Sequence, residues 1–244
     1  MGAMSSKEST VAKRSLQALG VASAIGAGVL AYSLAEAKSY RLRGVQVPVL
    51  EPGSEPLQVL HLSDLHMTPR QAGKAEWIQH LADLQPDLVV ATGDFMAHPD
   101  AVYPVTAALG PLLDIPGVFV FGSNDYYAPK IGNPFTYLVG PTNYDRGEPD
   151  LPWPELSSAL SSGGWIDLSN RRDHIKVDGR LIDVRGVDDP HIGRDQYEPI
   201  AGPFDPTADL ALGVSHAPYL RVLDAMADDG AQLIMAGHTH GGQV

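Results

Sequence analysis

DLVVATGD, at residues 87–94, is a short apolar run that ends in a glycine and an acidic residue. The same plan recurs in LQVLHLSD at 57–64, GVFVFGSND at 117–125, DLALGVSH at 209–216 and AQLIMAGHTH at 231–240. Because each run is short, apolar and bounded by polar residues, each is predicted to form a buried β-strand. Between the runs, helical spacing of Ala, Leu and Ile is found at 71–84, 101–113 and 217–228. Helices on both faces of a largely buried sheet make an α/β fold.

Two segments interrupt this alternation. Residues 126–164 are rich in Pro, Gly, Asn and aromatic side chains, which predicts a long insertion outside the core. Residues 174–187 alternate around Asp178-Gly179, a turn dipeptide typical of a β-hairpin. We therefore expect one domain over residues 57–244 that carries an insertion and a hairpin.

The composition limits the classes of function. A chain of 244 residues with 44% hydrophobic residues can form one sizeable core plus an appendage. The net charge of −12 argues against a nucleic-acid partner, because phosphate-backbone binding needs clustered Lys and Arg. The chain has no cysteine, so any bound metal ion would be held by histidine, carboxylate or amide groups.

The N-terminal segment contains an uncharged stretch at residues 15–35, SLQALGVASAIGAGVLAYSLA. Its length suits a membrane-spanning helix, so we expect a transmembrane anchor between a tail at 1–14 and a linker at 36–56. A signal peptide cleaved near Ala35-Glu36-Ala37 and a buried helix are the alternatives. Basic residues flank both ends and leave the orientation open. The expected localisation is a single-pass membrane protein, with the large domain outside the cytoplasm as the favoured side.

Each of the five strand-like runs finishes in residues that can bind a metal ion. These residues are Asp64, His66, Asp94, Asn124, Asp125, His216, His238 and His240. The carboxyl ends of strands in an open α/β sheet meet at one crevice, so residues distant in the chain would converge there. In an extended chain, residues two apart project to the same side, so Asp64 with His66, or His238 with His240, could hold one ion. The other histidines, His61, His80, His98, His174 and His191, are interpreted as ordinary surface or core residues.

The motifs SDLH, TGD, GSND, SH and GHTH in this order resemble the signature of the calcineurin-like metallophosphoesterases, over residues 57–243. The resemblance implies a two-sheet αββα sandwich. It implies a first metal ion held by Asp64, His66, Asp94 and His240. It implies a second metal ion held by Asp94, Asn124, His216 and His238, with the Asp94 carboxylate bridging the two. With the N-terminal segment, the chain also resembles a membrane-anchored bacterial subgroup similar to UDP-2,3-diacylglucosamine pyrophosphatases.

The ligand chemistry supports a hydrolase. Carboxylate oxygens mixed with imidazoles suit manganese, zinc or iron, and manganese is the ion we expect. Two such ions can clamp the attacking and leaving oxygens of an in-line displacement and can lower the pKa of a bridging water, so that hydroxide attacks. The glycines around His238 and His240 would leave room for ions and phosphate. We therefore expect hydrolysis of a phosphoester or pyrophosphate bond, with a metal-binding scaffold that lacks turnover as the alternative.

The third motif departs from the family pattern. Family members usually have Gly-Asn-His-Asp or Gly-Asn-His-Glu, whereas this chain has Gly122-Ser123-Asn124-Asp125. Without a gap Ser123 takes the ligand position, and with one residue dropped Asn124 keeps it, which we prefer because an amide oxygen is the better ligand. Asp125 is the candidate catalytic residue, although nearby cations would keep it ionised. The leaving group would then be assisted by the metal ions or by another side chain such as His191. Alternatively, the substrate has a leaving group that needs little assistance.

The substrate class follows from the insertion and the N-terminal segment. Tyr126, Tyr127, Phe135, Tyr137, Tyr144 and Trp153 follow the third motif and would overhang the crevice. A lipid or cell-envelope phosphoester, or a phosphorylated small molecule, is the expected substrate, and the N-terminal helix would bring contact with a membrane. Family members continue beyond GHTHGGQ, so the C-terminal end at Val244 is expected to be truncated.

Overall fold

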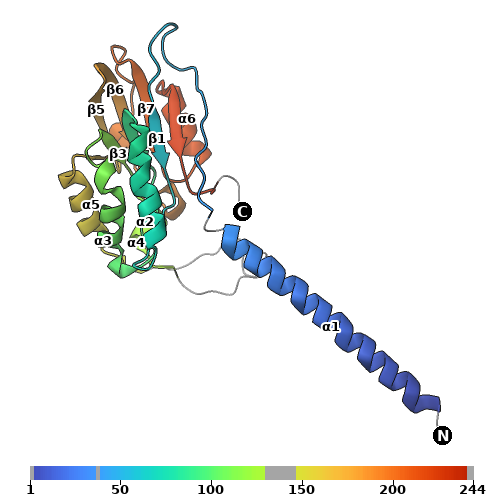
Figure 1. Ribbon diagram of the computed structural model, residues 1–244. Coiled ribbons are helices and arrows are strands. Elements are labelled where there is room, and N and C mark those ends of the chain that lie inside the picture. The colour runs from blue at the N-terminus through green and yellow to red at the C-terminus, as the bar shows by residue number, and fades with distance from the viewer. Residues whose placement is uncertain (1–2, 37–38, 130–146, 241–244) are drawn as a thin grey trace. The chain divides into compact units, whose positions relative to one another are not determined.

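The computed structural model of the protein describes residues 3–36, 39–129 and 147–240 (Figure 1). The chain divides into two units, residues 1–45 and residues 46–244. The first unit contains one helix, α1 (Ala3–Glu36). The second unit contains all of the described strands and the other described helices, so it carries the candidate site.

The expected membrane anchor is not confirmed. The uncharged stretch at 15–35 does lie in a helix, but within the described residues no helix is both long enough and apolar enough to cross a membrane. The physical reason is composition: alanine, glycine and serine fill much of the stretch and supply little apolar surface. The predicted single-pass membrane localisation is therefore wrong.

The first sheet places three of the motif loops side by side. Its four strands are parallel, in the order β1-β2-β3-β4. They are β1 (Val59–Leu62), β2 (Leu88–Ala91), β3 (Gly117–Phe119) and β4 (Ile166–Asp167). Leu62 pairs with Ala91, which pairs with Phe119, so β1, β2 and β3 end level with one another.

The remaining motif loops follow strands of the second sheet. Its strands have the order β5-β6-β7-β8. They are β5 (Arg171–Val177), β6 (Arg180–Gly186), β7 (Leu210–Ser215) and β8 (Leu233–Ala236). β5 and β6 form an antiparallel hairpin that turns through positive φ at Asp178 and Gly179, which confirms the predicted hairpin. β6, β7 and β8 are parallel, and the last pair, Ser215 with Ala236, ends at the same edge.

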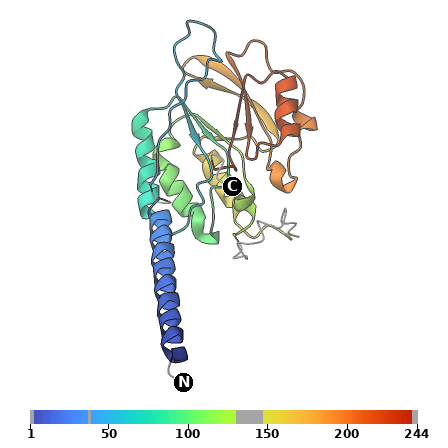
Figure 2. The ribbon, with the colours of Figure 1, turned by 90° about the vertical axis from the view of Figure 1, so that its right-hand side faces the viewer.

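The two sheets pack face to face between helices. In β2, Val89 and Ala91 face the helices, while Leu88 and Val90 face the second sheet, whose Leu212 belongs to the same cluster. The first sheet is covered by α2 (Ala72–Gln79), α3 (Val102–Leu109) and α5 (Trp153–Ser162), and the second by α6 (Leu220–Asp228). Figure 2 shows α6, in orange-red, on the opposite side of the sheets from α2 and α3. The predicted α/β fold with two sheets is confirmed.

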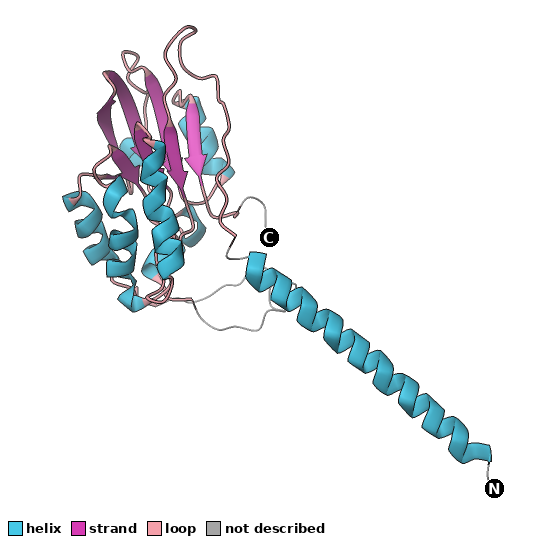
Figure 3. Cartoon of the chain, in the orientation of Figure 1, coloured by secondary structure: helices cyan, strands magenta, loops and turns pink. Residues whose placement is uncertain are grey.

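Short helices connect these elements, as the cyan segments of Figure 3 show. They are η1 (His80–Leu84), η2 (Pro99–Ala101), η3 (Gly110–Leu112), α4 (Ser123–Tyr126), η5 (Pro190–Ile192) and η6 (Glu198–Ile200). α4 begins directly after the third motif glycine and η5 follows β6, so both lie where the chain leaves a strand at its carboxyl end.

The segment predicted as an insertion contains a core helix. Leu156 and Leu160 of α5 are fully buried against the first sheet, and Trp165 is buried beside them. The spacing of Leu156 and Leu160, four residues apart, was a helical signal that the Pro and Gly content obscured. Residues 130–146, with the predicted contacts of Phe135, Tyr137 and Tyr144, lie outside the described residues, as do the last residues, 241–244.

Candidate metal centre

Six of the predicted ligands meet in two groups at the carboxyl ends of the strands. The first ligand group consists of Asp64, His66 and His240, and the second of Asp94, His216 and His238. Within each group the ligand atoms lie within 4.8 Å of one another. The groups are assembled from the loops after β1, β2, β7 and β8, so both sheets contribute.

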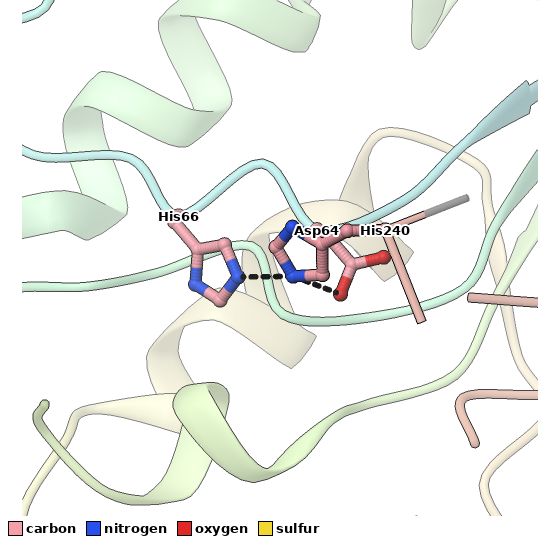
Figure 4. Close-up of side chains that lie close together, drawn as sticks. All are labelled: Asp64, His66 and His240. Carbon is pink, nitrogen blue, oxygen red and sulfur yellow. Dashed lines mark hydrogen bonds and ion pairs between the residues drawn. The ribbon is translucent and has the colours of Figure 1, made fainter. Parts of the chain in front are cut away.

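The first ligand group is open to solvent on the histidine side. The Nε2 atom of His240 lies 3.3 Å from Asp64 Oδ1 and 3.4 Å from His66 Nε2, and Figure 4 shows the three side chains converging. The two imidazole rings stack with their centroids 5.3 Å apart. Two imidazole nitrogens facing each other at this distance, beside a carboxylate, make a set of donors suited to a cation.

The Asp94 carboxylate connects the two groups. Its Oδ2 atom lies 3.5 Å from His216 Nε2 and 3.7 Å from His66 Nε2. Asp94 and His216 are buried, and the His238 ring packs edge-on against His216 with centroids 5.1 Å apart. One carboxylate therefore faces imidazoles of both groups, which is the placement that a bridging ligand requires.

Two buried atoms show that these residues fit a cation. His216 Nε2 and Asp64 Oδ1 are buried and have no hydrogen-bond partner among the described residues. The other ring nitrogen of His216, Nδ1, donates to the Thr92 carbonyl oxygen at 2.6 Å, so in the neutral ring, the form that binds a metal ion, the lone pair is on Nε2. Their ion-pair contacts, His240 Nε2 at 3.3 Å from Asp64 Oδ1 and Asp94 Oδ2 at 3.5 Å from His216 Nε2, are not hydrogen bonds, so a bound cation would satisfy both atoms.

The ligand loops have an unusual backbone. Five ligands have φ between 42° and 68°, in the left-handed region that residues other than glycine seldom adopt. They are Asp64, His66, Asp94, His238 and His240. Such conformations cost free energy and cluster at functional sites. The extended geometry assumed for the two pairs therefore differs from the structure, and His238 and His240 enter different ligand groups.

The site also shifts the pKa values of its own ligands. Burial lowers the pKa of His216, but the neighbouring Asp94 outweighs this effect and raises it to about 10. Burial raises the pKa of Asp94, and the contacts with His216 and His66 outweigh it and hold the value below its usual range. Burial and the nearby imidazoles of His216 and His191 lower the pKa of His238 to about 4. Without a cation, His216 is thus charged at neutral pH and His238 is neutral.

Metal binding is expected to release protons. A histidine ligand must be neutral, so a cation in the second ligand group displaces the proton of His216, whereas His238 has none to lose above about pH 5. We expect affinity for Mn²⁺ to rise about tenfold per pH unit between pH 7 and 9, with release of about one proton. Calorimetric titration in buffers of different ionisation enthalpy measures both quantities. Affinity that is independent of pH would contradict this assignment.

Asn124 contacts the bridging carboxylate directly. Its backbone N–H donates to Asp94 Oδ1 at 2.8 Å, and its side-chain Nδ2 donates to Asp94 Oδ2 at 2.7 Å. The amide group thus lies beside the second ligand group. For Asn124 to act as a ligand, its amide oxygen would have to take the place of the nitrogen, which a rotation of the amide plane achieves.

Asp125 faces the backbone behind the ligands. Its Oδ2 accepts from the N–H groups of Asp94 at 2.8 Å and Gly122 at 2.9 Å, and its Oδ1 accepts from Phe95 at 2.8 Å and Met96 at 3.1 Å. The side chain is completely buried. Burial and the Asp94 charge raise the pKa of Asp125 to about 8, against the pull of these N–H groups toward the ionised form. Asp125 therefore ties the second motif loop to the third. Its catalytic role stays a prediction.

Glycines leave the space that the ligands occupy. A Cβ atom at Gly122 would lie 2.7 Å from His216 Nε2 and closer still to Asp94 Oδ1. A Cβ atom at Gly237 would lie 2.9 Å from Asp64 Oδ2 and Thr92 Oγ1. Gly237 therefore makes room for the side chains around the ligands, and Gly122 has the same role in the third motif. That the glycines also leave room for ions and phosphate stays a prediction.

Replacing Gly122 by Ala is expected to displace Asp94 or His216. Because such changes around metal ligands cost about 10- to 100-fold in metal affinity, we expect a loss of that size for the second cation. Titration with Mn²⁺ followed by elemental analysis measures it. The control is Gly110→Ala, where an added Cβ meets nothing within 4 Å. Equal affinity in both variants would contradict the tight packing around Gly122.

Two histidines that belong to neither ligand group lie beside the ligands. His61 lines a cleft of about 540 Å³ together with Ser63, Asp64 and His240, and its Nε2 lies 2.9 Å from Thr92 Oγ1. His191, which the sequence suggests either as an ordinary residue or as a source of help for the leaving group, lies against the second ligand group, with its ring centroid 4.5 Å from that of His238. The strand-end motifs do not mark either residue, because His61 lies inside β1 and His191 follows β6, whose end carries no motif. The sequence therefore named His191 only as one of several sources of help for the leaving group.

The chain is similar to a known protein family and to individual proteins. A family model described as calcineurin-like phosphoesterase matches residues 57–242. The Bacillus subtilis (strain 168) protein YpbG is 27% identical over 235 residues, 95% of this chain and 80% of that protein. The metallophosphoesterase YkoQ of the same organism is 27% identical over 199 residues, 79% of this chain and 64% of that protein. The crystal structure of phosphopantetheinyl hydrolase from Mycobacterium tuberculosis has a TM-score of 0.43 at 13% identity, covering 75% of this chain and 83% of that one.

Proposed function

Because the chain belongs to the calcineurin-like phosphoesterase family, we propose that it is a metal-dependent hydrolase of phosphoester or pyrophosphate bonds. The observation that carries the proposal is the pair of adjacent ligand groups joined by Asp94. Calcineurin-like phosphoesterases use dinuclear metal centres, and the two groups offer donors for two cations. The unpartnered Nε2 of His216 and Oδ1 of Asp64 support the same conclusion.

Each cation would have its own set of ligands. Asp64, His66 and His240 would hold one, and His216 and His238 the other, while Asp94 faces both. We propose manganese as the ion, because mixed carboxylate and imidazole ligands suit it. Bound there, two divalent cations supply Lewis-acid activation of water and neutralise charge on a phosphoryl group. Only two ligands are carboxylates, so a loaded centre keeps a net positive charge that attracts phosphate.

The third motif favours substrates with a good leaving group. Asn124 is engaged with Asp94, and Asp125 accepts backbone N–H groups, so neither presents a proton to a departing oxygen. A pyrophosphate or an ester of an acidic alcohol needs the least help. We propose a phosphorylated small molecule that enters by the cleft beside Asp64 and His240. A lipid or cell-envelope phosphoester is the narrower hypothesis. Tyr126, which was expected to overhang the crevice, is buried against Phe121 and Trp153 and does not support it.

Metal removal and restoration test the proposal. The protein is stripped with a chelator, Mn²⁺, Zn²⁺ or Mg²⁺ is returned, and hydrolysis of nitrophenyl phosphate monoesters and diesters is measured. Turnover that vanishes with the metal and returns with Mn²⁺ is expected. Two bound Mn²⁺ ions without turnover would instead favour a metal-binding scaffold, for which the engaged Asn124 and Asp125 are the supporting observation.

A further inference from the structure

The two oxygens of the Asp64 carboxylate have different surroundings. Oδ1 lies 3.3 Å from His240 Nε2, is buried and has no hydrogen-bond partner among the described residues. Oδ2 accepts two hydrogen bonds, from Ser63 Oγ at 2.5 Å and from the backbone N–H of His238 at 3.0 Å. One oxygen therefore faces the first ligand group, and the other is held by hydrogen bonds from the protein.

The contact between Ser63 and Asp64 depends on the backbone of the loop after β1. Neighbouring residues of an extended strand point to opposite sides, so a hydrogen bond between their side chains is not expected there. Asp64, however, has a φ of 55°, and its backbone N–H donates to the Gly93 carbonyl oxygen at 3.0 Å. This left-handed turn brings the Asp64 carboxylate to the hydroxyl of the preceding residue.

The loop after β8 packs against the Ser63 hydroxyl. A Cβ atom at Gly237 would overlap Ser63 Oγ, so the two loops touch at this hydroxyl. Ser63 follows β1 of the first sheet, whereas Gly237 and His238 follow β8 of the second. Donors from loops of both sheets therefore hold Asp64 Oδ2 in place.

These two hydrogen bonds favour one mode of cation binding. In bidentate binding both carboxylate oxygens face the same cation. Asp64 Oδ2 could turn to the cation only by leaving Ser63 Oγ and the His238 N–H. Because hydrogen bonds to an ionised carboxylate are about twice as strong as those between neutral groups, the arrangement favours binding through Oδ1 alone.

We propose that Ser63 is a positioning residue for the cation of the first ligand group, and that its hydroxyl holds Asp64 so that the carboxylate binds through Oδ1. The inference rests on the proposed function, because it needs a cation among Asp64, His66 and His240. Ser63 itself stays outside the set of ligands, since its hydroxyl donates to Asp64. The serine of the SDLH motif thereby gains a role that the ligand groups do not assign to it.

Stepwise binding of Mn²⁺ tests the inference apart from turnover. Mn²⁺ is titrated into the metal-free full chain, the free ion is measured by electron paramagnetic resonance, and anomalous diffraction at limiting Mn²⁺ shows which ligand group loses its ion. Partners that orient metal ligands contribute about 10- to 100-fold to metal affinity, so Ser63→Ala is expected to weaken the first ligand group by that factor. Binding at the second ligand group is expected to stay as in wild type.

The matched control is Ser157→Ala. Ser157 Oγ donates to Asp167 Oδ2 at 3.0 Å, so this variant also removes a hydrogen bond from a serine to an aspartate, outside both ligand groups. Both steps of Mn²⁺ binding are expected to stay at the wild-type level. In crystals of the manganese-loaded wild type, Asp64 is expected to contact manganese through Oδ1 while Oδ2 keeps its hydrogen bond from Ser63.

The outcomes separate the inference from the function on which it rests. If the wild type binds two Mn²⁺ ions and hydrolyses nitrophenyl esters, but Ser63→Ala binds both ions as tightly, the inference fails and the function stands. If Ser63→Ala weakens both steps equally, or if both Asp64 oxygens contact manganese in the wild type, the inference again fails. If the wild type neither binds Mn²⁺ nor hydrolyses these esters, the proposed function itself is overturned.

Discussion

Replacing Asp94 by Asn is expected to lower metal-dependent hydrolysis about a thousandfold. The Asp94 carboxylate lies between both ligand groups, so an amide there removes the shared negative ligand without changing the shape of the side chain. Metal ions contribute several kcal/mol of charge stabilisation to such reactions. Losing about 4 kcal/mol of it corresponds to about three powers of ten in rate. Rates with nitrophenyl esters, with manganese content determined on the same samples, measure the effect.

The control for Asp94→Asn is Asp114→Asn, which makes the same chemical change at an exposed position away from the ligands. It should leave rate and manganese content at the wild-type level. Asp94→Asn should in addition bind less than two equivalents of manganese. Full turnover in Asp94→Asn would show that the reaction does not use the shared carboxylate, and the proposed centre would have to be abandoned.

Replacing Asp125 by Ala is expected to destabilise the domain strongly. Four backbone N–H groups of two loops lose their acceptor together: those of Asp94, Phe95, Met96 and Gly122. An unsatisfied buried polar group costs about 1–3 kcal/mol, so we expect a loss of about 4 kcal/mol or more in the free energy of unfolding. Urea unfolding of the metal-free protein measures this loss separately from any effect on metal binding.

Asp125→Asn and Asp114→Ala complete that experiment. Asn keeps one carbonyl oxygen as an acceptor but turns an NH₂ group toward N–H donors, so an intermediate loss is expected. The exposed Asp114→Ala should stay within about 0.5 kcal/mol of wild type. If Asp125→Ala were as stable as the Asp114 control, the carboxylate would not be what ties the two loops together.

The fold followed from the sequence because burial leaves a local signal. DLVVATGD is apolar on both faces of β2, and the structure buries Leu88 and Val90 on one face and Val89 and Ala91 on the other. Apolar runs with polar ends thus predicted where five strands lie and where their loops meet. The order of the motifs then predicted the side chains that the structure gathers in the two ligand groups.

The remaining geometry depends on contacts that the sequence does not display. The left-handed backbone of the ligand loops is set by the surrounding structure and not by residue type, so the extended geometry assumed for His238 and His240 was wrong. The family resemblance, and not that geometry, predicted that the two histidines enter different ligand groups. Asp125 turns inward because α4 starts at Ser123 and directs it at the neighbouring loop. His191 lies beside His238, and its Nδ1 lies 3.2 Å from the Tyr219 hydroxyl, a contact between distant residues that no motif marks.

Anomalous diffraction from crystals grown with Mn²⁺ tests the central claim most directly. Two manganese peaks about 3.5–4 Å apart are predicted. One should lie among Asp64, His66 and His240, the other should lie between His216 and His238, and Asp94 should contact both. An absence of peaks at these side chains, or a single peak that leaves His216 Nε2 without a partner, would contradict the account.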